Sequence, residues 1–448
     1  MEKRRATFGG KISAVLVTAG SAVGLGNIWR FPYVAGENGG GAFLMLYIVC
    51  ILLMGLPLMI SEFSIGAATK KNAVGAFRAL NKRWAGVGYL GILTSTLILG
   101  FYLVVAGWTA EYMIHSLAND PILHTTDIAV HQQAFTDFIG HPWKPLFYAT
   151  LFSLATHLII VLGVKGGIER ASKVMMPLLF LFLIVLAVHS ILMPGGEAGV
   201  RFFLTPDFSK LTMHSVLAAV GQAFFSLSIG LGTMITYASY FKKETNIQHT
   251  ALEVTMLDTL VAFLAGLVIF PAVFSAGIEA GAGPSLVFIT LPAIFSSMPM
   301  SALWAGIFFV LLVLAALTST ISLHESITAY LHEEWQLRRT HAAWITTLLT
   351  TLLGLFASLS LGAWEWLKVC GLSLFDALDF LTANIMLPLG GLLTCIFVGW
   401  RMDRTLFQRQ LYPTTFTRPL LYRLLRFLIR YFAPVIVAMI FLDSLGII

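Results

Sequence analysis

The chain has 448 residues, of which 58% are hydrophobic and only 11% are charged, and its mean hydropathy is +0.85. Soluble domains carry roughly 25% charged residues to cover their surface, so this composition excludes a water-soluble globular protein; it also excludes a disordered chain, which would be poor in apolar residues. The formal net charge of +6 indicates no nucleic-acid partner, because the basic residues lie between apolar segments and form no patch.

Polar and Gly/Pro-rich clusters divide the chain into apolar segments that are each long enough to cross a bilayer as a helix. A spanning segment must satisfy its own backbone hydrogen bonds, so helices are expected. The sequence therefore predicts an all-α polytopic membrane protein with eleven transmembrane helices in a lipid bilayer. The segments are 12–36, 43–66, 87–116, 146–163, 174–193, 214–239, 250–276, 302–331, 342–360, 372–400 and 426–446.

Lysine and arginine residues gather in alternate loops. The N-terminal residues Lys3, Arg4, Arg5 and Lys11 belong to the rich set, and the positive-inside rule then predicts a cytoplasmic N-terminus and an outside C-terminus. No clean signal-peptide cleavage site follows these residues, and the chain has no Asn-x-Ser/Thr acceptor. We therefore expect a multi-pass protein of a prokaryotic inner (cell) membrane. The loops of the poor set hold Lys144, Arg201, Lys210 and Lys368.

Two predicted spans contain the tripeptide Gly-Leu-Gly, at 24–26 in the first and at 230–232 in the sixth. Glycine is a poor helix former, and unwound backbone is tolerated at membrane depth only where it lines a cavity or is buried in protein. One such run would fit close helix packing, but a pair in corresponding positions, five spans apart, favours a binding site between two broken helices.

The same spacing predicts the domain organisation. Five spans separate the two runs, and because five is an odd number the second set of five is inverted in the membrane relative to the first. We expect a single transporter domain over the whole chain. Its parts are a first five-helix repeat at 12–193, a second, inverted repeat at 214–400 and an additional helix 11 at 426–446.

Polar residues inside the other spans indicate what such a site binds. Asp258 lies in the seventh span, where a carboxylate costs about 2.5–3.5 kcal/mol on the insertion scale and is a functional candidate, most simply facing a cation. The eighth span contains Thr318, Ser319 and Thr320. These hydroxyls could bind a cation, although such groups also bond to the carbonyls of their own helix.

The residues around both breaks resemble the neurotransmitter:sodium symporter family. Residues 20–32 and 37–43 look like the first-helix signature of that family, 221–228 and 235–240 resemble its sixth helix, and 289–295 resemble its fourth outer loop. The resemblance covers the chain to its eleventh span and is to bacterial sodium-coupled amino-acid transporters. It implies a 5+5 inverted-repeat fold with broken helices 1 and 6, and sodium-coupled symport by alternating access without enzymatic activity.

The resemblance also implies two sodium sites. In the first, the substrate carboxylate would itself be a ligand, which links ion binding and substrate binding thermodynamically. The protein ligands of the first site would be the Ala22 carbonyl and the side chains of Asn27, Ser226 and Asp258. Those of the second would be the carbonyls of Gly20, Val23 and Ala315 and the hydroxyls of Thr318 and Ser319.

The implied substrate site lies between the two breaks. Family members that carry amines without a carboxylate have an Asp where this chain has Gly24, and Leu231 stands where a bulkier aromatic would narrow the pocket. The expected substrate is thus a neutral, hydrophobic L-amino acid, with another small carboxylated solute as the alternative. The substrate-binding residues would be Ala22, Leu25, Gly26, Ile98, Tyr102, Phe225, Ser226, Ser228, Leu231, Ser319 and Leu323.

Two departures from the family bear on chloride. Asp258 stands where many relatives have Asn, and Ala262 stands where chloride-dependent relatives have Ser. Tyr47, Gln222 and Ser226 keep other parts of that anion site. We expect the charge of Asp258 to substitute for chloride, so that chloride is not required.

Charged residues near the ends of the spans resemble the gates of the family. Arg30 and Asp379, with Phe225, would form the outer gate, and Arg5 and Glu333 the inner gate. An Arg within a span needs a partner, which supports the first pairing, whereas loop charges such as Arg5 and Glu333 are often only solvated.

Two other classes of membrane protein fit the sequence less well than a transporter does. An ion channel needs a continuous polar pore or a ring of like groups, and no span supplies one. A membrane enzyme would need clustered ligands or nucleophiles, and the histidines in the spans show no His-x-x-x-His spacing. The oligomeric state is left open by the sequence.

Overall fold

The computed structural model describes residues 5–277, 286–412 and 420–444. Within these ranges, nine helices are long and apolar enough to cross a membrane, and Lys11–Ala22 with Gly26–Glu37 form a further span that is bent by 54° at its break. The sixth predicted span is also present but is split between Met213–Ser226 and Thr233–Ala238. The all-α polytopic fold with eleven spans is thus confirmed.

The first five spans occupy the N-terminal half of the chain. Several are interrupted by a π-helical turn, which the pattern of apolar residues does not reveal. The elements are α1 (Lys11–Ala22), η1 (Gly26–Arg30), α2 (Phe31–Glu37), α3 (Gly41–Cys50), η2 (Ile51–Gly55), α4 (Leu56–Thr69), α5 (Ala73–Leu80), η3 (Lys82–Trp84), α6 (Ala85–Leu117), η4 (Pro121–His124), α7 (Ile128–Gly140), α8 (Lys144–Val161), η5 (Val164–Glu169) and α9 (Arg170–Ile191).

The remaining spans follow after a short helix outside the bundle. Two short paired strands precede the tenth span, where Lys368 pairs with Ser373. The elements are α10 (Gly196–Leu204), η6 (Phe208–Lys210), α11 (Met213–Ser226), α12 (Thr233–Ala238), α13 (Ile247–Ser275), η7 (Leu286–Thr290), α14 (Leu291–Ser296), α15 (Ser301–Glu334), α16 (Arg339–Leu359), β1 (Lys368–Val369), β2 (Leu372–Ser373), α17 (Leu374–Phe380), η8 (Leu381–Met386), α18 (Leu387–Ile396), η9 (Phe397–Arg401), α19 (Arg404–Leu411), α20 (Leu420–Phe427), η10 (Leu428–Phe432) and α21 (Ala433–Ser444).

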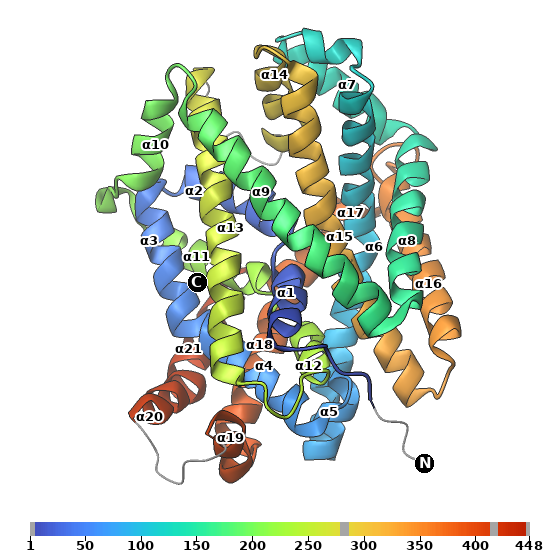
Figure 1. The fold of residues 1–448 in the computed structure, drawn as a ribbon, viewed down its shortest axis with the longest axis vertical. Helices are drawn as coiled ribbons and strands as arrows, with labels where there is room; N and C mark the ends of the chain where they lie inside the picture. Colours follow the sequence, from blue (N-terminus) through green and yellow to red (C-terminus); the bar gives the residue numbers. More distant parts are fainter. Residues whose placement is uncertain (1–4, 278–285, 413–419, 445–448) are drawn as a thin grey trace.

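The broken first helix lies inside the bundle. α1 packs against α9, α13 and α15, and Figure 1 shows it surrounded by these longer helices. The long helices α6 and α15 pack along each other, with α8 and α16 against them. The unbroken helices α6 and α15 thus pack along each other beside the broken first and sixth spans.

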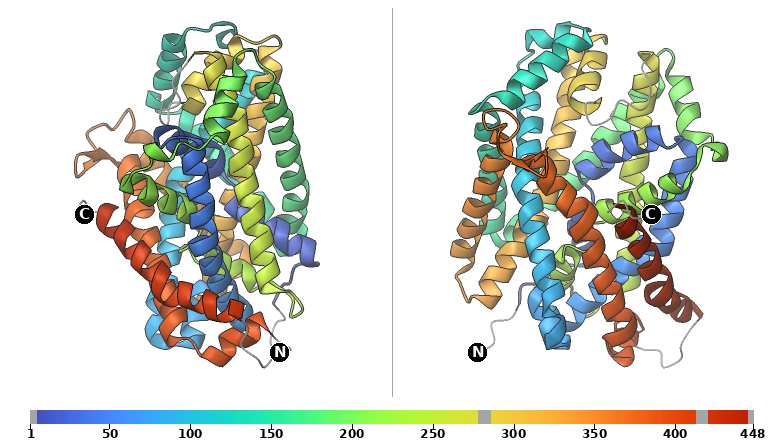
Figure 2. Two further views of the ribbon diagram at one scale, coloured as in Figure 1. Left: turned by 90° about the vertical axis from the view of Figure 1, so that its left-hand side faces the viewer. Right: turned by 180° about the vertical axis from the view of Figure 1, so that it is seen from behind.

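The two ends of the bundle carry different elements. The short helices α7, α10 and α14 lie at one end, and α5, α19 and α20 lie at the other, where the N-terminus is also found (Figures 1 and 2). We call the end with the N-terminus the N-terminal end and the opposite end the outer end.

Candidate functional site

The break in the first helix is a short stretch of extended backbone after α1. Val23 has φ −66° and ψ 116°, and the amides that follow are bonded to side chains rather than to the helix. The amide of Gly24 donates to Asn27 Oδ1 at 3.0 Å, and the amide of Leu25 donates to the Tyr102 hydroxyl at 3.2 Å. The break therefore presents backbone donors next to a phenol from α6.

The break in the sixth helix needs glycine. Between α11 and α12, Gly230 and Gly232 have φ +88° and +71°, a region that side chains other than glycine rarely adopt. A Cβ on Gly230 would also lie 2.6 Å from the Leu387 carbonyl. The amide of Gly230 donates to Glu62 Oε1 at 2.7 Å, and this carboxylate is fully buried. Glycines at this break were singled out from the sequence, but the partner on α4 was not.

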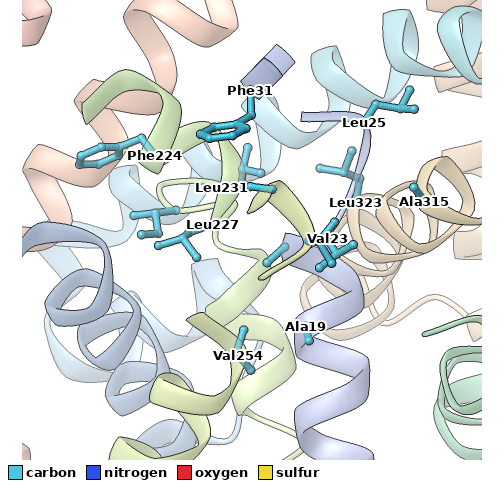
Figure 3. Packing of buried hydrophobic residues seen from close by; sticks show 14 of the residues in the cluster. Ala19, Val23, Leu25, Phe31, Phe224, Leu227, Leu231, Val254, Ala315 and Leu323 are labelled. Carbon is cyan, nitrogen blue, oxygen red and sulfur yellow. The ribbon is translucent and has the colours of Figure 1, made fainter. Parts of the chain in front are cut away.

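A cavity of about 40 Å³ lies between the two breaks. All predicted substrate-binding residues line it except Leu25, which lines a larger cavity on the outer side. Figure 3 shows Leu231 and Leu323 close to Val23, where the chain leaves α1. Four further residues line the cavity that were not named as substrate-binding residues: Ser21, Gly24, Ser322 and Leu387.

Asp258 on α13 is fully buried beside this cavity. One of its carboxylate oxygens accepts a hydrogen bond from Asn27 Nδ2 at 2.8 Å, and the other accepts one from the Ser226 hydroxyl at 2.8 Å and one from the Tyr47 hydroxyl at 3.4 Å. Asn27 also donates to Ser226 at 2.8 Å. The structure thus brings together the three side chains that the resemblance assigned to the first sodium site.

The second predicted cation cluster lies where α1 faces α15. The Thr318 hydroxyl is 3.2 Å from the Val23 carbonyl and 2.9 Å from the Ala315 carbonyl, and the Ser319 hydroxyl is 3.4 Å from Val23. A Cβ on Gly20 would lie 3.5 Å from the Thr318 side chain. The Val23 and Ala315 carbonyls and the Thr318 and Ser319 hydroxyls therefore converge, and these four groups are uncharged.

On the outer side the cavity between the breaks is followed by one of about 360 Å³, lined largely by aromatic side chains. Tyr102, Gly26 and Phe225 line both cavities. The guanidinium of Arg30 lies 4.7 Å from the centre of the Phe225 ring. Arg30 and Asp379 both line the larger cavity, but none of the ion pairs among the described residues joins them.

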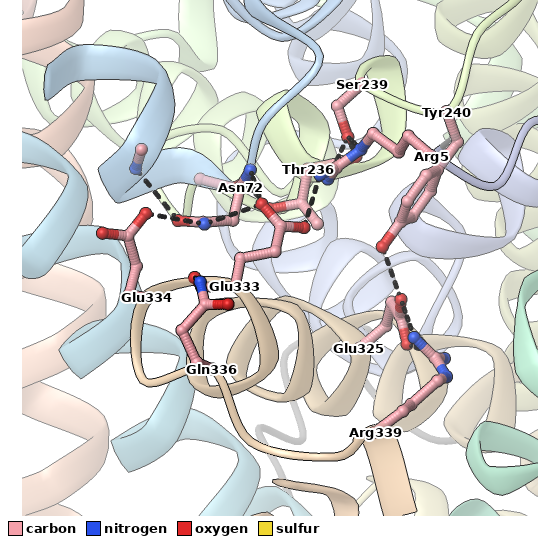
Figure 4. Close-up of polar contacts among 12 residues, drawn as sticks. Arg5, Asn72, Thr236, Ser239, Tyr240, Glu325, Glu333, Glu334, Gln336 and Arg339 are labelled. Atoms are coloured by element: carbon pink, nitrogen blue, oxygen red, sulfur yellow. Dashed lines mark hydrogen bonds and ion pairs between the residues drawn. The ribbon is translucent and has the colours of Figure 1, made fainter. Parts of the chain in front are cut away.

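The N-terminal side of the site is closed by charged groups (Figure 4). Arg5 forms an ion pair with Glu333 and donates to the Ser239 hydroxyl at 2.6 and 2.9 Å. The other Glu333 oxygen accepts from the amide and the side chain of Asn72, both at 2.9 Å. The ring of Phe8 packs edge-on against Tyr240. Arg5 and Glu333 are therefore paired, not merely solvated.

A second charged group lies deeper on this side. Glu325 on α15 is fully buried, and its oxygens accept from Arg339 on α16 at 2.5 and 3.0 Å and from the Tyr240 hydroxyl at 2.7 Å. Figure 4 shows the bond from Tyr240 to Glu325, and the Arg5 guanidinium lies 4.8 Å from the centre of the Tyr240 ring, so Tyr240 contacts both charged groups. A carboxylate within the eighth span was visible in the sequence, but nothing in the sequence identified its partner.

The described residues hold no group of three or more His, Cys, Asp or Glu side chains that could bind a metal ion. The oxygen groups that the structure brings together beside the two breaks are carbonyls, hydroxyls, the Asn27 amide and the Asp258 carboxylate, while the Glu62 carboxylate accepts from the Gly230 amide. Oxygen ligands of this kind at broken helices are suited to sodium.

Comparison with known proteins agrees with this arrangement. The model of the sodium:neurotransmitter symporter family matches residues 5–140 and 127–447. The chain belongs to this family. It is 36% identical over 448 residues to an uncharacterised sodium-dependent transporter of Bacillus subtilis, and the alignment covers 100% of this chain and 99% of the relative. It is 39% identical over 414 residues to another from Haemophilus influenzae, which covers 89% of this chain and 90% of the relative.

A solved structure has the same fold. The crystal structure of MhsT in complex with L-phenylalanine matches with a TM-score of 0.90 and 40% identity, over 98% of this chain and 100% of that chain. Together these comparisons show that the protein is a multi-pass, sodium-dependent membrane transporter of a small molecule and not an enzyme.

Proposed function

We propose that this transporter carries neutral, hydrophobic L-amino acids together with sodium by alternating access. The arrangement around Gly24 carries the proposal. A Cβ there would meet the Ser319 hydroxyl and lie 3.3 Å from the Tyr102 hydroxyl, so only glycine leaves space for a ligand beside Tyr102 at the first break. Backbone amides at a broken helix, with a phenol beside them, favour a carboxylate.

The two ends of an amino acid would bind different backbone groups. Its carboxylate would accept from the amides of Leu25 and Gly26 and from the Tyr102 hydroxyl. Its ammonium would donate to the carbonyls of Ala22, Phe225 and Ser226. The proximity of the Leu25 amide to Tyr102, at 3.2 Å, supports the first half of this assignment, because both are donors to one anionic group.

The substrate side chain would lie against Ile98, Leu231 and Leu323. These residues are nearly fully buried, and an apolar lining favours a hydrophobic side chain through burial of its surface. The complex of MhsT with L-phenylalanine supports a substrate of this kind. Such a pocket separates side chains that differ by one methylene by only about 10- to 200-fold, so we expect several aliphatic or aromatic amino acids to be carried.

We place two sodium ions at the two oxygen clusters. The first would be bound by Ala22, Asn27, Ser226 and Asp258 with the substrate carboxylate, and the second by the cluster around Thr318. The convergence of Asn27 and Ser226 on the Asp258 carboxylate supports the first site. Shared binding of the substrate carboxylate makes the affinities for sodium and for the amino acid depend on each other.

Transport would not require chloride. The Asp258 carboxylate accepts hydrogen bonds from Tyr47 and Ser226, which are two of the groups that would otherwise face an anion, and Ala262 offers no hydroxyl. We expect sodium-driven uptake into proteoliposomes to be unchanged when chloride is replaced by gluconate. Uptake that collapses in gluconate would contradict this assignment.

The decisive experiment is a thermal-shift screen of the purified transporter with each amino acid in sodium and in potassium buffer. We expect hydrophobic L-amino acids to raise the melting temperature in sodium only.

The Tyr102→Phe variant should lose about tenfold or more in amino-acid affinity, because a hydrogen bond to a charged group is lost. Tyr330→Phe, which is remote from the site, is the matched control.

The outcomes of this screen separate the possible substrates. No shift beyond the potassium control for any amino acid would refute the proposal. A shift with carboxylates that lack the amino group would replace the amino acid by another small carboxylated solute.

The gates and the orientation complete the proposal. We assign Arg30, Asp379 and Phe225 to the outer gate and Arg5 and Glu333 to the inner gate. From the basic loops we infer that the N-terminal end faces the cytoplasm, that the transporter lies in the inner membrane of the cell, and that the C-terminus lies outside. A protease-accessible tag at each terminus, tested in intact cells, checks this orientation.

A further inference from the structure

An arginine-rich pocket lies at the N-terminal end of the bundle, away from the substrate site. It has a volume of about 410 Å³ and lies between α19, α20 and η10. Figure 1 shows α19 and α20 at the end where the N-terminus lies. Its lining consists of four arginines and three aromatic residues. We name it the arginine pocket after Arg404, Arg423, Arg426 and Arg430.

No ion pair within the described residues balances the charges of the arginine pocket, because none involves these four arginines. The neighbouring Asp403 is occupied as the N-cap of α19, where it accepts from the amides of Thr405 and Leu406. Arg430 Nε is buried and has no hydrogen-bond partner in the part of the chain that the structure describes. Four guanidinium groups around one cavity repel one another unless an anion lies between them.

The position of Arg430 is fixed by its surroundings. Its guanidinium lies 4.0 Å from the Trp400 ring centre and 5.3 Å from that of Tyr431, and Trp400 Nε1 donates to the Arg430 carbonyl at 3.2 Å. A Cβ on Gly399 would lie 3.0 Å from Arg430 Cα. Gly399 thus lets η9 and η10 approach closely, and this contact holds the charge at the edge of the pocket.

The rim of the arginine pocket is apolar and exposed. Phe427 is 56% exposed, Tyr431 47% and Trp400 52%, and Leu420, Leu421 and Leu424 of α20 are also exposed. In a membrane protein such side chains contact lipid, and Trp and Tyr mark the interface with water. The feature therefore combines a cationic pocket at headgroup level with an apolar surface that continues into the bilayer.

We propose that the arginine pocket binds the headgroup phosphate of an anionic phospholipid, whose acyl chains lie along Phe427 and Tyr431. Guanidinium groups form paired, charge-assisted hydrogen bonds with phosphate oxygens, and basic pockets between spans bind anionic headgroups. A zwitterionic lipid would leave the excess positive charge unbalanced. Free phosphate would not use the apolar rim. The proposal is independent of the substrate and of the sodium sites.

The test uses the full-length transporter purified in detergent. Native mass spectrometry and thermal shift are measured with phosphatidylglycerol, phosphatidylcholine and inorganic phosphate. We expect phosphatidylglycerol alone to remain bound and to raise the melting temperature. The variant R426Q/R430Q should bind it about thirtyfold more weakly, from roughly fivefold for each charge at the membrane surface. R83Q, which removes an exposed arginine elsewhere at the same end, should bind as the unmodified transporter does.

Arg430 packs on Trp400, so a second variant guards against a folding defect. R404Q/R423Q removes two exposed members of the pocket and should also weaken binding of phosphatidylglycerol. Unchanged binding in both double variants would overturn the proposal. Equal stabilisation by phosphatidylcholine would overturn the preference for an anionic headgroup, and equal stabilisation by inorganic phosphate would overturn the assignment to a lipid.

Discussion

The N-terminal and outer sides of the substrate site are closed by different kinds of contact. On the N-terminal side, two connected groups of charged residues, Arg5 with Glu333 and Glu325 with Arg339, join the N-terminal segment, α15 and α16. On the outer side, the Arg30 guanidinium lies over the Phe225 ring below a cavity of about 360 Å³, and aromatic contacts such as that of Trp29 with Phe288 surround this cavity. Among the described residues, the charged contacts that must break to open the site are therefore more numerous on the N-terminal side than on the outer side.

This difference indicates which conformation the protein favours. Charge-assisted hydrogen bonds contribute about 1.5–3 kcal/mol each, whereas a cation-π contact contributes about 0.5–1 kcal/mol where it is exposed to water. The conformation that is closed on the N-terminal side should hence predominate in the absence of substrate. Substrate and sodium would then bind from the outer side.

Removal of Arg339 should have the largest effect. Arg339→Ala leaves the Glu325 carboxylate buried without its ion-pair partner, which typically costs about 3–5 kcal/mol. We expect a large fall in the melting temperature of the purified transporter. Asp379→Asn on the outer side is the control and should change it little. Equal effects of the two variants would show that the two sides do not differ as described.

Opening of the inner gate should have an intermediate effect. Arg5→Ala removes the ion pair with Glu333 and the bonds to Ser239, a loss of about 1.5–3 kcal/mol. A cysteine introduced as Ser322→Cys lines the cavity between the breaks. With the exposed Cys370 replaced by Ser, this cysteine should react faster with a water-soluble maleimide in the Arg5→Ala variant. No change in rate would argue against a gating role of Arg5.

The outer contact should have a smaller effect. Arg30→Gln removes the interaction with the Phe225 ring, and we expect about two- to fivefold faster release of bound amino acid, in line with the energy of a cation-π contact. The melting temperature should hardly change. Release of a radiolabelled amino acid, measured by scintillation proximity, would check this. A loss of free energy as large as that expected for Arg5→Ala would refute the difference between the two sides.

The smallest effect concerns pH. Burial lowers the pKa of Lys70 to about 8, with a further contribution from Arg5, and Lys70 Nζ donates to the Phe241 carbonyl at 2.5 Å. The folded state binds this proton less tightly than the unfolded state, whose value is 10.5. Its stability should therefore increase slightly as pH rises from about 8 to 10.5. Lys70→Met should lack this component in melting curves.

The sequence predicted the spans and both breaks because those features are local. Hydrophobic segment length identifies a span, and glycine pairs such as 24–26 and 230–232 identify a break without knowledge of distant residues. The candidate ligands were obtained from the family resemblance. Without it, Asp258 stood out as a charge inside an apolar segment, and Thr318, Ser319 and Thr320 stood out as a cluster of hydroxyls.

What the sequence did not predict depends on contacts between distant elements. Arg339 appeared as a loop charge, yet it reaches the buried Glu325. Glu62 was visible inside a span, but its partner is the backbone amide of Gly230, which no residue type marks. The π-helical turns were likewise not foreseen, since hydrophobic residues occupy them as they do the helices on either side.

The contact between α4 and α12 limits how the site can open. A Cβ on Gly66 would collide with the Ile235 carbonyl and would lie 3.0 Å from Ala238 Cβ, and Glu62 on the same helix holds the amide of Gly230. Because the backbones of α4 and α12 are in such close contact, the two helices cannot slide past each other. We expect the second span and the inner half of the sixth to move as one rigid body. A bulkier residue at Gly66 would then separate the movement of the second span from that of the sixth, while leaving every proposed ligand in place.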